Sequence, residues 1–396
     1  MASQDAIDGG RAQRSSPLND PKIRGLIYQV VVFVALVLFV WWIVDNTITN
    51  LRRAGIASGF EFLNGRAGFP ISTSLIEYTE DNTYARALLV GLLNTIYVAA
   101  FGIITATILG FLVGVGRLSN NWLISKICMC YVELFRNIPP LLVIFFWYFG
   151  VLAVLPLPRE SIDLPLGSYL NSRGFFVPKA IWGEGAWLIG VAFLVAIVLS
   201  WFVARRARAR QMATGEQFPV LWTSLGLLIG LPLLAYLVTG MPLTFEYPVL
   251  GTFNMTGGSQ VKPEFLALYM ALSFYTASFI AEIVRAGILG VNRGQSEASA
   301  ALGLSRGKAL RLVIIPQALR IAIPPLTSQY LNLTKNSSLA IAIGFPDLVA
   351  IGGTILNQSG QAVEIVVIWM AVYLSLSLLT SLFMNWFNAK MALVER

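Results

Sequence analysis

The chain has 396 residues and a mean hydropathy of +0.71; 56% of its residues are hydrophobic and only 12% are charged. A soluble domain carries about 25% charged residues, so this composition excludes an ordinary soluble protein and indicates that lipid surrounds most of the chain. The sequence contains no histidine, the commonest general base and metal ligand. No Ser/His/Asp or metal constellation can be assembled, so we expect a protein that is not an enzyme, with no catalytic residue and no metal site.

The N-terminal part predicts a tail, an anchor and a loop. Residues 1–25 are polar and of mixed charge, as in a tail exposed to water. Residues 26–45 are nearly all apolar and long enough to span a membrane once. We interpret them as a retained transmembrane anchor rather than a cleaved signal peptide, because the tail before them contains acids and no small-x-small cleavage site follows Val44. Residues 46–85 then predict a periplasmic loop.

Seven more apolar segments follow within residues 86–388. They predict spans at Leu88–Gly116, Ile127–Leu155, Ala186–Ala204, Val220–Gly240, Phe265–Val284, Ala318–Ile343 and Ile365–Phe387. The first of these segments is rich in glycines, which suit close helix packing in lipid: Gly91, Gly102, Gly110, Gly114 and Gly116. Two loops, 156–179 and 241–263, flank the two spans between them.

The distribution of charge predicts the topology, because lysine and arginine mark cytoplasmic loops. With eight spans and the N-terminus inside, the cytoplasmic segments are 1–25, 117–126, 205–219, 285–320 and 388–396. They contain the basic run Arg205–Arg210 and the basic residues between 285 and 320, whereas the outside loops hold acids. An odd number of spans would separate these two basic clusters. We therefore predict an all-α integral membrane protein with eight transmembrane helices and both termini cytoplasmic, in which the net charge of +8 needs no nucleic-acid partner.

Residues 294–316 form a short, basic and modestly amphipathic stretch between two spans. Ser296 can cap a helix that begins near Glu297, with Ser299 in its first turn. Three apolar residues recur there at helical spacing and could fill a groove on a partner: Ala298, Ala301 and Leu302. Gly303 then allows a turn, and Pro316 can begin the next helix. The alternative is an ordinary loop helix that packs on its own spans.

The predicted span Ala318–Ile343 is unusually polar, although a charged residue at the centre of a lone helix costs about 2.5–3.5 kcal/mol. It contains six hydrophilic residues: Ser328, Asn332, Lys335, Asn336, Ser337 and Ser338. The first four fall on one face, and such residues usually face a bundle interior or a wet cavity. We expect this face to line a substrate route; the alternative is that Lys335 pairs with an acid on a neighbouring span or subunit. Pro324 and Pro325 are expected to disrupt the helix inside the membrane.

Two acid–base pairs lie near predicted span ends, Glu133 with Arg136 and Glu282 with Arg285. Both have i,i+3 spacing and predict local ion pairs that lower the cost of insertion. Direct substrate contact or a gate that breaks and reforms are the alternatives. No nucleotide site is visible, because the sequence GLSRGK at 303–308 lacks the P-loop spacing and the following Ser or Thr.

The stretch at 294–316 resembles the EAA loop of ABC importer permeases, with Glu297-Ala298-Ser299, then Gly303, then Val313-Ile314-Ile315-Pro316. Ser299, Val313 and Ile315 are mild departures from that pattern. The segments around Glu133–Pro139, Ala281–Gly287 and Leu333–Leu339 are similar to the polar amino acid permeases of the histidine/glutamine type. Five spans are usual in that family. The N-terminal anchor and a two-span insertion at about 156–263 resemble the Q-type permeases of the general L-amino-acid importers, the Aap and Bzt systems.

The resemblance implies a type-1 ABC importer permease in the bacterial inner membrane, with its permease domain at 86–388 and a short tail at 389–396. It implies that the loop at 294–316 docks on an ATPase dimer that hydrolyses ATP, so this chain itself needs no cofactor. It also implies a second, homologous permease subunit and a periplasmic binding protein that delivers amino acids. If the polar face of Ala318–Ile343 lines the route of such a substrate, Lys335 is a candidate partner for its carboxylate. The rivals are an ion-coupled secondary amino-acid transporter, which would need an isolated intramembrane carboxylate, and a scaffold that transports nothing.

Overall fold

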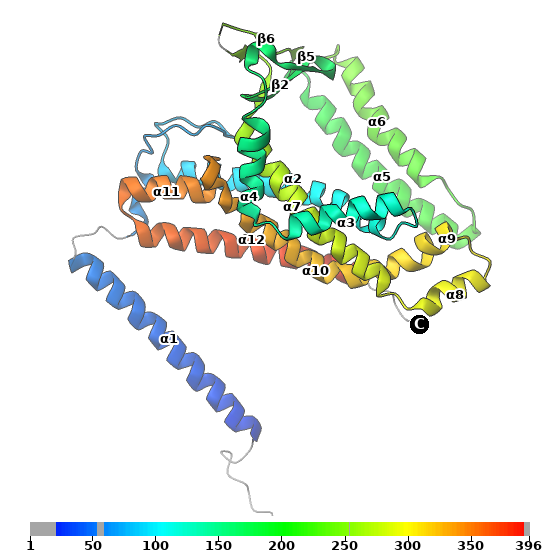
Figure 1. Ribbon diagram of the computed structural model, residues 1–396, viewed down its shortest axis with the longest axis horizontal. Coiled ribbons are helices and arrows are strands. Elements are labelled where there is room, and N and C mark those ends of the chain that lie inside the picture. The colour runs from blue at the N-terminus through cyan, green and yellow to red at the C-terminus, as the bar shows by residue number, and fades with distance from the viewer. Residues whose placement is uncertain (1–20, 54–58, 253, 392–396) are drawn as a thin grey trace, which may run out of the picture.

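The computed structural model describes residues 21–53, 59–252 and 254–391 (Figure 1). Most of the predicted N-terminal tail and the last five residues of the C-terminal tail therefore lie outside the described residues. The helices are α1 Pro21–Arg53, α2 Tyr84–Arg117, α3 Trp122–Arg136, α4 Pro140–Phe145, α5 Trp187–Thr214, α6 Val220–Val238, α7 Pro263–Leu289, α8 Arg293–Ala301, α9 Arg306–Ala309, α10 Ile315–Asn336, α11 Leu348–Ser359 and α12 Ala362–Met391. Short 3₁₀ or π turns occupy Phe60–Asn64, Phe146–Leu152, Pro158–Glu160, Pro165–Gly167, Leu310–Ile314 and Ser337–Ile343.

In the described part of the chain, seven helices are long and apolar enough to span a membrane, and a bent pair brings the number up to eight. This confirms the all-α membrane class, and each predicted span overlaps one of these helices or the bent pair. The predicted span Ile127–Leu155 is wrong as a single helix, because α3 and α4 meet at 109°. Proline restricts the residue before it and lacks an N–H, so Pro139 and Pro140 end α3 instead of merely kinking it.

The helices α2, α7 and α10 form the centre of the bundle, and α3 packs on α7 (Figure 1). Leu268, Leu272, Ile280 and Leu333 are fully buried among them. The glycines of α2 are in close contact with other helices, as expected. A Cβ on Gly110 would lie 2.5 Å from Ile280 Cβ, and one on Gly114 would lie 2.7 Å from the Ala281 carbonyl oxygen. Glycine therefore sets the distance between α2 and α7.

The helix α10 runs through Pro324 and Pro325 without a break, so the expected disruption was wrong. Both proline rings are exposed on the chain's own surface, where they do not clash with a packed neighbour. Transmembrane helices tolerate proline when the freed backbone groups find other partners. Pro316 lies in the first turn of α10, as predicted.

The insertion contains strands where the sequence predicted only loops. The strands are β1 Ile162–Leu164, β2 Ser168–Asn171, β3 Gly174–Val177, β4 Lys179–Trp182, β5 Leu243–Glu246, β6 Val249–Leu250, β7 Met255–Thr256 and β8 Ser259–Val261. One antiparallel sheet has the order β1-β2-β3-β8, and β4–β5 and β6–β7 form two-stranded pairs. The β3–β8 pairing, with Phe175 opposite Val261, joins the two loops of the insertion. Strands of two to four residues carry little periodicity, which is why the sequence does not reveal them.

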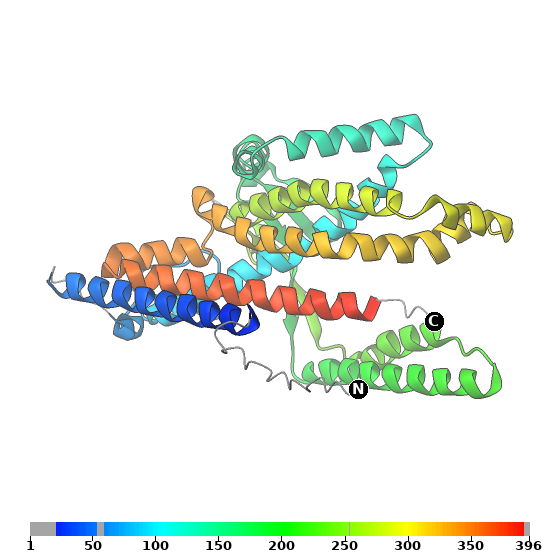
Figure 2. The same ribbon diagram turned by 90° about the horizontal axis from the view of Figure 1, so that it is seen from below.

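The helices α5 and α6 pack chiefly on each other, and most of their apolar side chains are exposed in this chain. Figures 1 and 2 place the turn between α5 and α6 at the same end of the molecule as α8 and α9. We call this end the α8–α9 end. In Figure 1 the helix α1 lies apart from the bundle, with its apolar side chains exposed. Lipid or another subunit must cover these surfaces in the membrane.

Candidate functional site

The helix α8 projects from the α8–α9 end of the bundle (Figures 1 and 2). It begins at Arg293, and the Asn292 side chain caps it by accepting a hydrogen bond from the Gly294 N–H at 2.9 Å. The expected start near Glu297 with Ser296 as the cap was wrong, because Asn292 is also a favoured cap residue and lies one turn earlier. Glu297 therefore lies in the middle of α8, where its side chain is exposed.

The C-terminus of α8 is a Schellman motif centred on Gly303. Gly303 has φ of +71°, its N–H bonds to the Ala300 carbonyl, and the Leu304 N–H bonds to the Ser299 carbonyl. Apart from its chain neighbours, no atom of the described residues lies within 4 Å of the position of a Cβ on Gly303. The requirement for glycine here is therefore conformational and not steric, and the predicted turn is confirmed.

The residues of α8 divide between two faces. Ser299 is 3% exposed, and its hydroxyl donates to the Gln295 carbonyl at 2.7 Å. Gln317 of α10 donates to the Gln295 side chain at 3.2 Å, which fixes α8 to the start of α10. The apolar residues Ala298, Ala301 and Leu302 are exposed, and Leu302 is 80% exposed. Within residues 21–53, 59–252 and 254–391, the structure thus leaves an apolar surface on a positioned helix without a partner.

The polar face of α10 points away from the core of this chain. Ser328, Asn332 and Lys335 are exposed, and Asn336 is half-buried. Among the described residues, no acid lies within ion-pair distance of Lys335, so the intramolecular ion pair is not formed within them. The four residues share one face, as the spacing predicted, and they remain available to a cavity or to a neighbouring subunit.

Ser337 and Ser338 belong to a different environment from the other four. The Ser337 hydroxyl is buried and donates to the Thr334 carbonyl at 2.7 Å, and the Ser338 hydroxyl donates to the Lys335 carbonyl at 2.8 Å. Both hydroxyls thus satisfy carbonyls at the C-terminal end of α10, where the chain tightens into a 3₁₀ turn. This local role suffices to explain both residues.

The predicted acid–base pairs lie in one cluster near the α8–α9 end. Glu282 accepts hydrogen bonds from Arg285 at 2.5 and 3.2 Å, as predicted, and also from Arg117 at the end of α2. Glu133 lies 3.9 Å from Arg117 and not beside Arg136, so the predicted Glu133–Arg136 pair was wrong. The Arg136 guanidinium instead lies over the Phe279 ring, 5.5 Å from its centroid. The sequence could not show Arg117 as the central cation, because three separate helices bring these side chains together.

We expect Glu282→Gln to lower the stability of the extracted protein by about 1–3 kcal/mol, because it leaves the nearly buried Arg117 without its main counter-charge. The matched control is Glu133→Gln, which neutralises a carboxylate on a side chain that is 57% exposed and should change stability by less than about 1 kcal/mol. Thermal melting in detergent checks both variants. Equal shifts would show that the cluster acts only through its net charge.

Sequence reasoning missed Asp347, which caps α11 from a buried position. Its Oδ1 accepts from the Ala350 N–H at 2.8 Å, whereas its Oδ2 has no partner among the described residues. Burial raises the pKa of the Asp347 carboxyl to about 7, although the backbone hydrogen bonds oppose this rise. Thr95 of α2 accepts from the Leu348 N–H, and Trp369 of α12 donates to the Leu348 carbonyl, both at 3.1 Å. These bonds fix the start of α11 between the two long helices α2 and α12. With 12 residues, α11 itself is too short to be a candidate span.

Comparison with known proteins places this architecture in a family. Residues 102–393 match the model of the binding-protein-dependent transport system inner membrane component. The chain is 67% identical over 381 residues to the general L-amino acid transport system permease protein AapQ of Rhizobium johnstonii, covering 96% of this chain and 95% of that protein. It is 50% identical to the putative amino-acid ABC transporter permease protein YhdX of Escherichia coli, covering 95% of this chain and 96% of that one.

A third relative matches the chain over a similar extent. The chain is 41% identical over 414 residues to the glutamate/glutamine/aspartate/asparagine transport system permease protein BztB of Rhodobacter capsulatus, covering 95% of this chain and 96% of that protein. These matches extend through the insertion and not only through the shared permease core. The chain therefore belongs to the family of binding-protein-dependent transport system inner membrane components, as a multi-pass permease subunit of an ABC amino-acid transport system of the general L-amino-acid type.

Proposed function

We propose that this chain forms part of the transmembrane route by which an ATP-driven importer moves a broad range of L-amino acids from the periplasm to the cytoplasm. One observation carries the proposal: α8 presents Ala298, Ala301 and Leu302 to solvent, while Asn292, Gln317 and Gly303 hold the helix in place. An exposed apolar surface on a rigid helix is what a groove on a partner recognises. The occupant of this surface is the ATPase dimer, which hydrolyses ATP in place of this chain.

The proposed mechanism joins this surface to the polar face of α10. Movement of the ATPase subunits would push α8, and the bond between Gln317 and Gln295 would pass that movement to the start of α10. The face with Ser328, Asn332, Lys335 and Asn336 would meet the second permease subunit, and the substrate would pass between the two subunits. Lys335 supplies a cation for the substrate carboxylate, and the amide side chains supply acceptors for its ammonium group. A periplasmic binding protein would deliver the amino acid. The α8–α9 end and both termini would then face the cytoplasm.

One observation favours the ion-coupled alternative. Asp347 is a buried carboxyl between two candidate spans, and its raised pKa lies near neutral pH, as a proton-binding site would require. Its bond to the Ala350 N–H gives it a structural role as well, because helix caps are commonly aspartate. Glu133 and Glu282, by contrast, lie beside Arg117 and cannot serve as isolated ion sites.

The test is gentle extraction of the chain by a C-terminal tag, mass spectrometry of the co-purified proteins, and uptake in proteoliposomes with ATP enclosed. We expect an ATPase subunit and a second permease to co-purify, and we expect uptake that requires ATP, the binding protein and no proton gradient. Asp347→Asn keeps the cap and removes the titrating group, so uptake should fall less than twofold. A homo-oligomer without an ATPase, with uptake that a protonophore and Asp347→Asn both abolish, would establish the ion-coupled transporter instead.

A further inference from the structure

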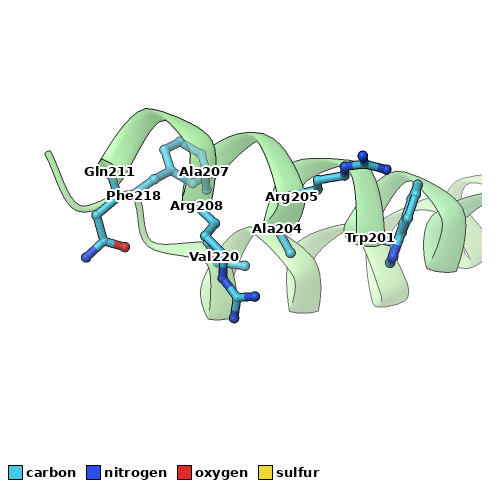
Figure 3. Close-up of a pocket in the computed structure, with 8 residues that line it drawn as sticks. All are labelled: Trp201, Ala204, Arg205, Ala207, Arg208, Gln211, Phe218 and Val220. Carbon is cyan, nitrogen blue, oxygen red and sulfur yellow. The ribbon is translucent and has the colours of Figure 1, made fainter. Parts of the chain in front are cut away.

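The end of α5 carries an arginine cluster that the transport mechanism above does not use. Arg205, Arg206, Arg208 and Arg210 occur within six residues, just before the turn that joins α5 to α6. About 20 residues of a helix cross the hydrocarbon core of a membrane, and α5 has 28. Its last turns therefore extend into the headgroup region. The apolar helix α6 begins at Val220, beside Arg208, which places the arginines at the membrane boundary (Figure 3).

The four arginines divide into two pairs on different faces of α5. Arg206 and Arg210 are four residues apart, and Arg210 is neutralised by Glu216 at 2.7 Å. Arg205 and Arg208 are three residues apart, and among the described residues neither has an acid within ion-pair distance. Like charges at this spacing destabilise a helix. The face with Arg205 and Arg208 therefore carries two positive charges that no acid of the described residues neutralises.

A pocket lies on this face of the hairpin (Figure 3). Its volume is about 580 Å³, and its lining includes Trp201, Arg205, Arg208, Gln211, Phe218 and Val220. The Arg205 guanidinium lies over the Trp201 ring, 5.4 Å from its centroid, which holds the arginine against an aromatic surface at headgroup depth. Trp201, Phe218 and Val220 give the pocket apolar lining. The Arg205 guanidinium lies at the Trp201 end and the Arg208 guanidinium at the Val220 end, so both must turn inward to meet one phosphate (Figure 3).

We propose that this pocket binds the phosphate of an anionic phospholipid, with Arg205 and Arg208 on the phosphate and the acyl chains along Trp201 and the start of α6. Arginine binds phosphate by paired N–H donors, and basic pockets at the ends of transmembrane helices select anionic lipids. The lipid would cover part of the outer surface of the α5–α6 hairpin, which no other segment of the described residues covers. Because α5 and α6 pack chiefly on each other, the bound lipid would hold the hairpin at a fixed depth beside the bundle.

The test measures binding of labelled phosphatidylglycerol to the intact transport complex in detergent, with phosphatidylcholine as the neutral probe. We expect R205Q/R208Q to weaken phosphatidylglycerol binding about 30-fold, since each arginine at the membrane surface contributes about fivefold. The control R206Q/R210Q makes the same charge change on the other face, where these two arginines line a smaller pocket of about 440 Å³ and Arg210 is paired with Glu216. It should weaken binding less than about fivefold. ATP-driven uptake in the presence of excess phosphatidylglycerol should be the same for both double variants, which separates this inference from the proposed transport function.

Three results would overturn the proposal. Equal losses in the two double variants would show diffuse attraction of anionic lipid to the basic end rather than a site. Equal affinity for phosphatidylcholine would show an apolar groove without phosphate recognition. Full displacement of the labelled lipid by excess inorganic phosphate, with no need for acyl chains, would assign the pocket to a soluble phosphate.

Discussion

Gly303→Val should lower ATP-driven uptake at least tenfold while the protein remains at normal levels in the membrane. Gly303 has φ of +71°, a conformation that costs a residue with a side chain about 1–2 kcal/mol and a β-branched residue more. The valine should therefore shift to negative φ, which breaks the bond from the Leu304 N–H to the Ser299 carbonyl and unwinds the end of α8. Leu302, the 80%-exposed residue that directly follows α8, would then leave the position at which a partner can bind it.

Two control variants isolate the backbone conformation at Gly303. Gly307→Val introduces the same side chain four residues later, where φ is not positive and no atom lies near the position of a Cβ, and it should retain most uptake. Gly303→Asn should restore at least half of the uptake, because asparagine tolerates the left-handed conformation better than valine. The measurements are uptake in proteoliposomes and co-purification of the ATPase. If Gly303→Val and Gly307→Val behave alike, the Schellman turn does not position the docking surface.

The sequence was informative about α8 because its pattern depends on local chemistry. Glycine at a turn, apolar residues at helical spacing and proline at the next helix start are properties of neighbouring residues, and the structure confirms each of them. The start of α8 was misplaced by one turn, because Asn292 and Ser296 are both acceptable caps and only the fold selects between them. Which face of α8 is open is also a property of the fold, since Ser299 turns inward beside Ala298, which turns outward.

Features that depend on contacts between distant segments could not be predicted. Arg117 joins Glu133 and Glu282 across three helices, and only the fold shows that the local pair with Arg136 is not formed. The strands β3 and β8 pair although both α5 and α6 lie between them in the sequence, so no local sequence pattern predicts this pairing. Proline gave opposite results at two sites. Pro139 and Pro140 follow the end of α3, whereas Pro324 and Pro325 lie inside α10 on an exposed face. The sequence alone does not distinguish these two outcomes.

Two pairs of glycines with the same four-residue spacing, one in α2 and one in α6, lie in different environments. Gly110 and Gly114 of α2 are four residues apart, and both face α7 at distances that leave no room for a Cβ. Gly226 and Gly230 of α6 have the same spacing, but no atom lies within 4 Å of a Cβ at either position. The two motifs are equivalent in the sequence and differ only in the fold. They therefore provide a direct test of whether the α2–α7 distance is set by glycine.

Gly114→Val should abolish recovery of the folded complex or lower its stability by more than about 3 kcal/mol, whereas Gly226→Val should change it by less than about 1 kcal/mol. The new Cβ at Gly114 would lie 2.7 Å from the Ala281 carbonyl oxygen, which belongs to the α7 backbone and can move only if the whole helix moves. Such a shift would also separate Arg117, three residues further along α2, from Glu282 of α7. Size-exclusion profiles and thermal melting of the extracted complex measure both variants. Tolerance of valine at Gly114 would show that α2 and α7 lie further apart in the membrane, and a loss at Gly226 alone would show that the open face of α6 packs on another subunit.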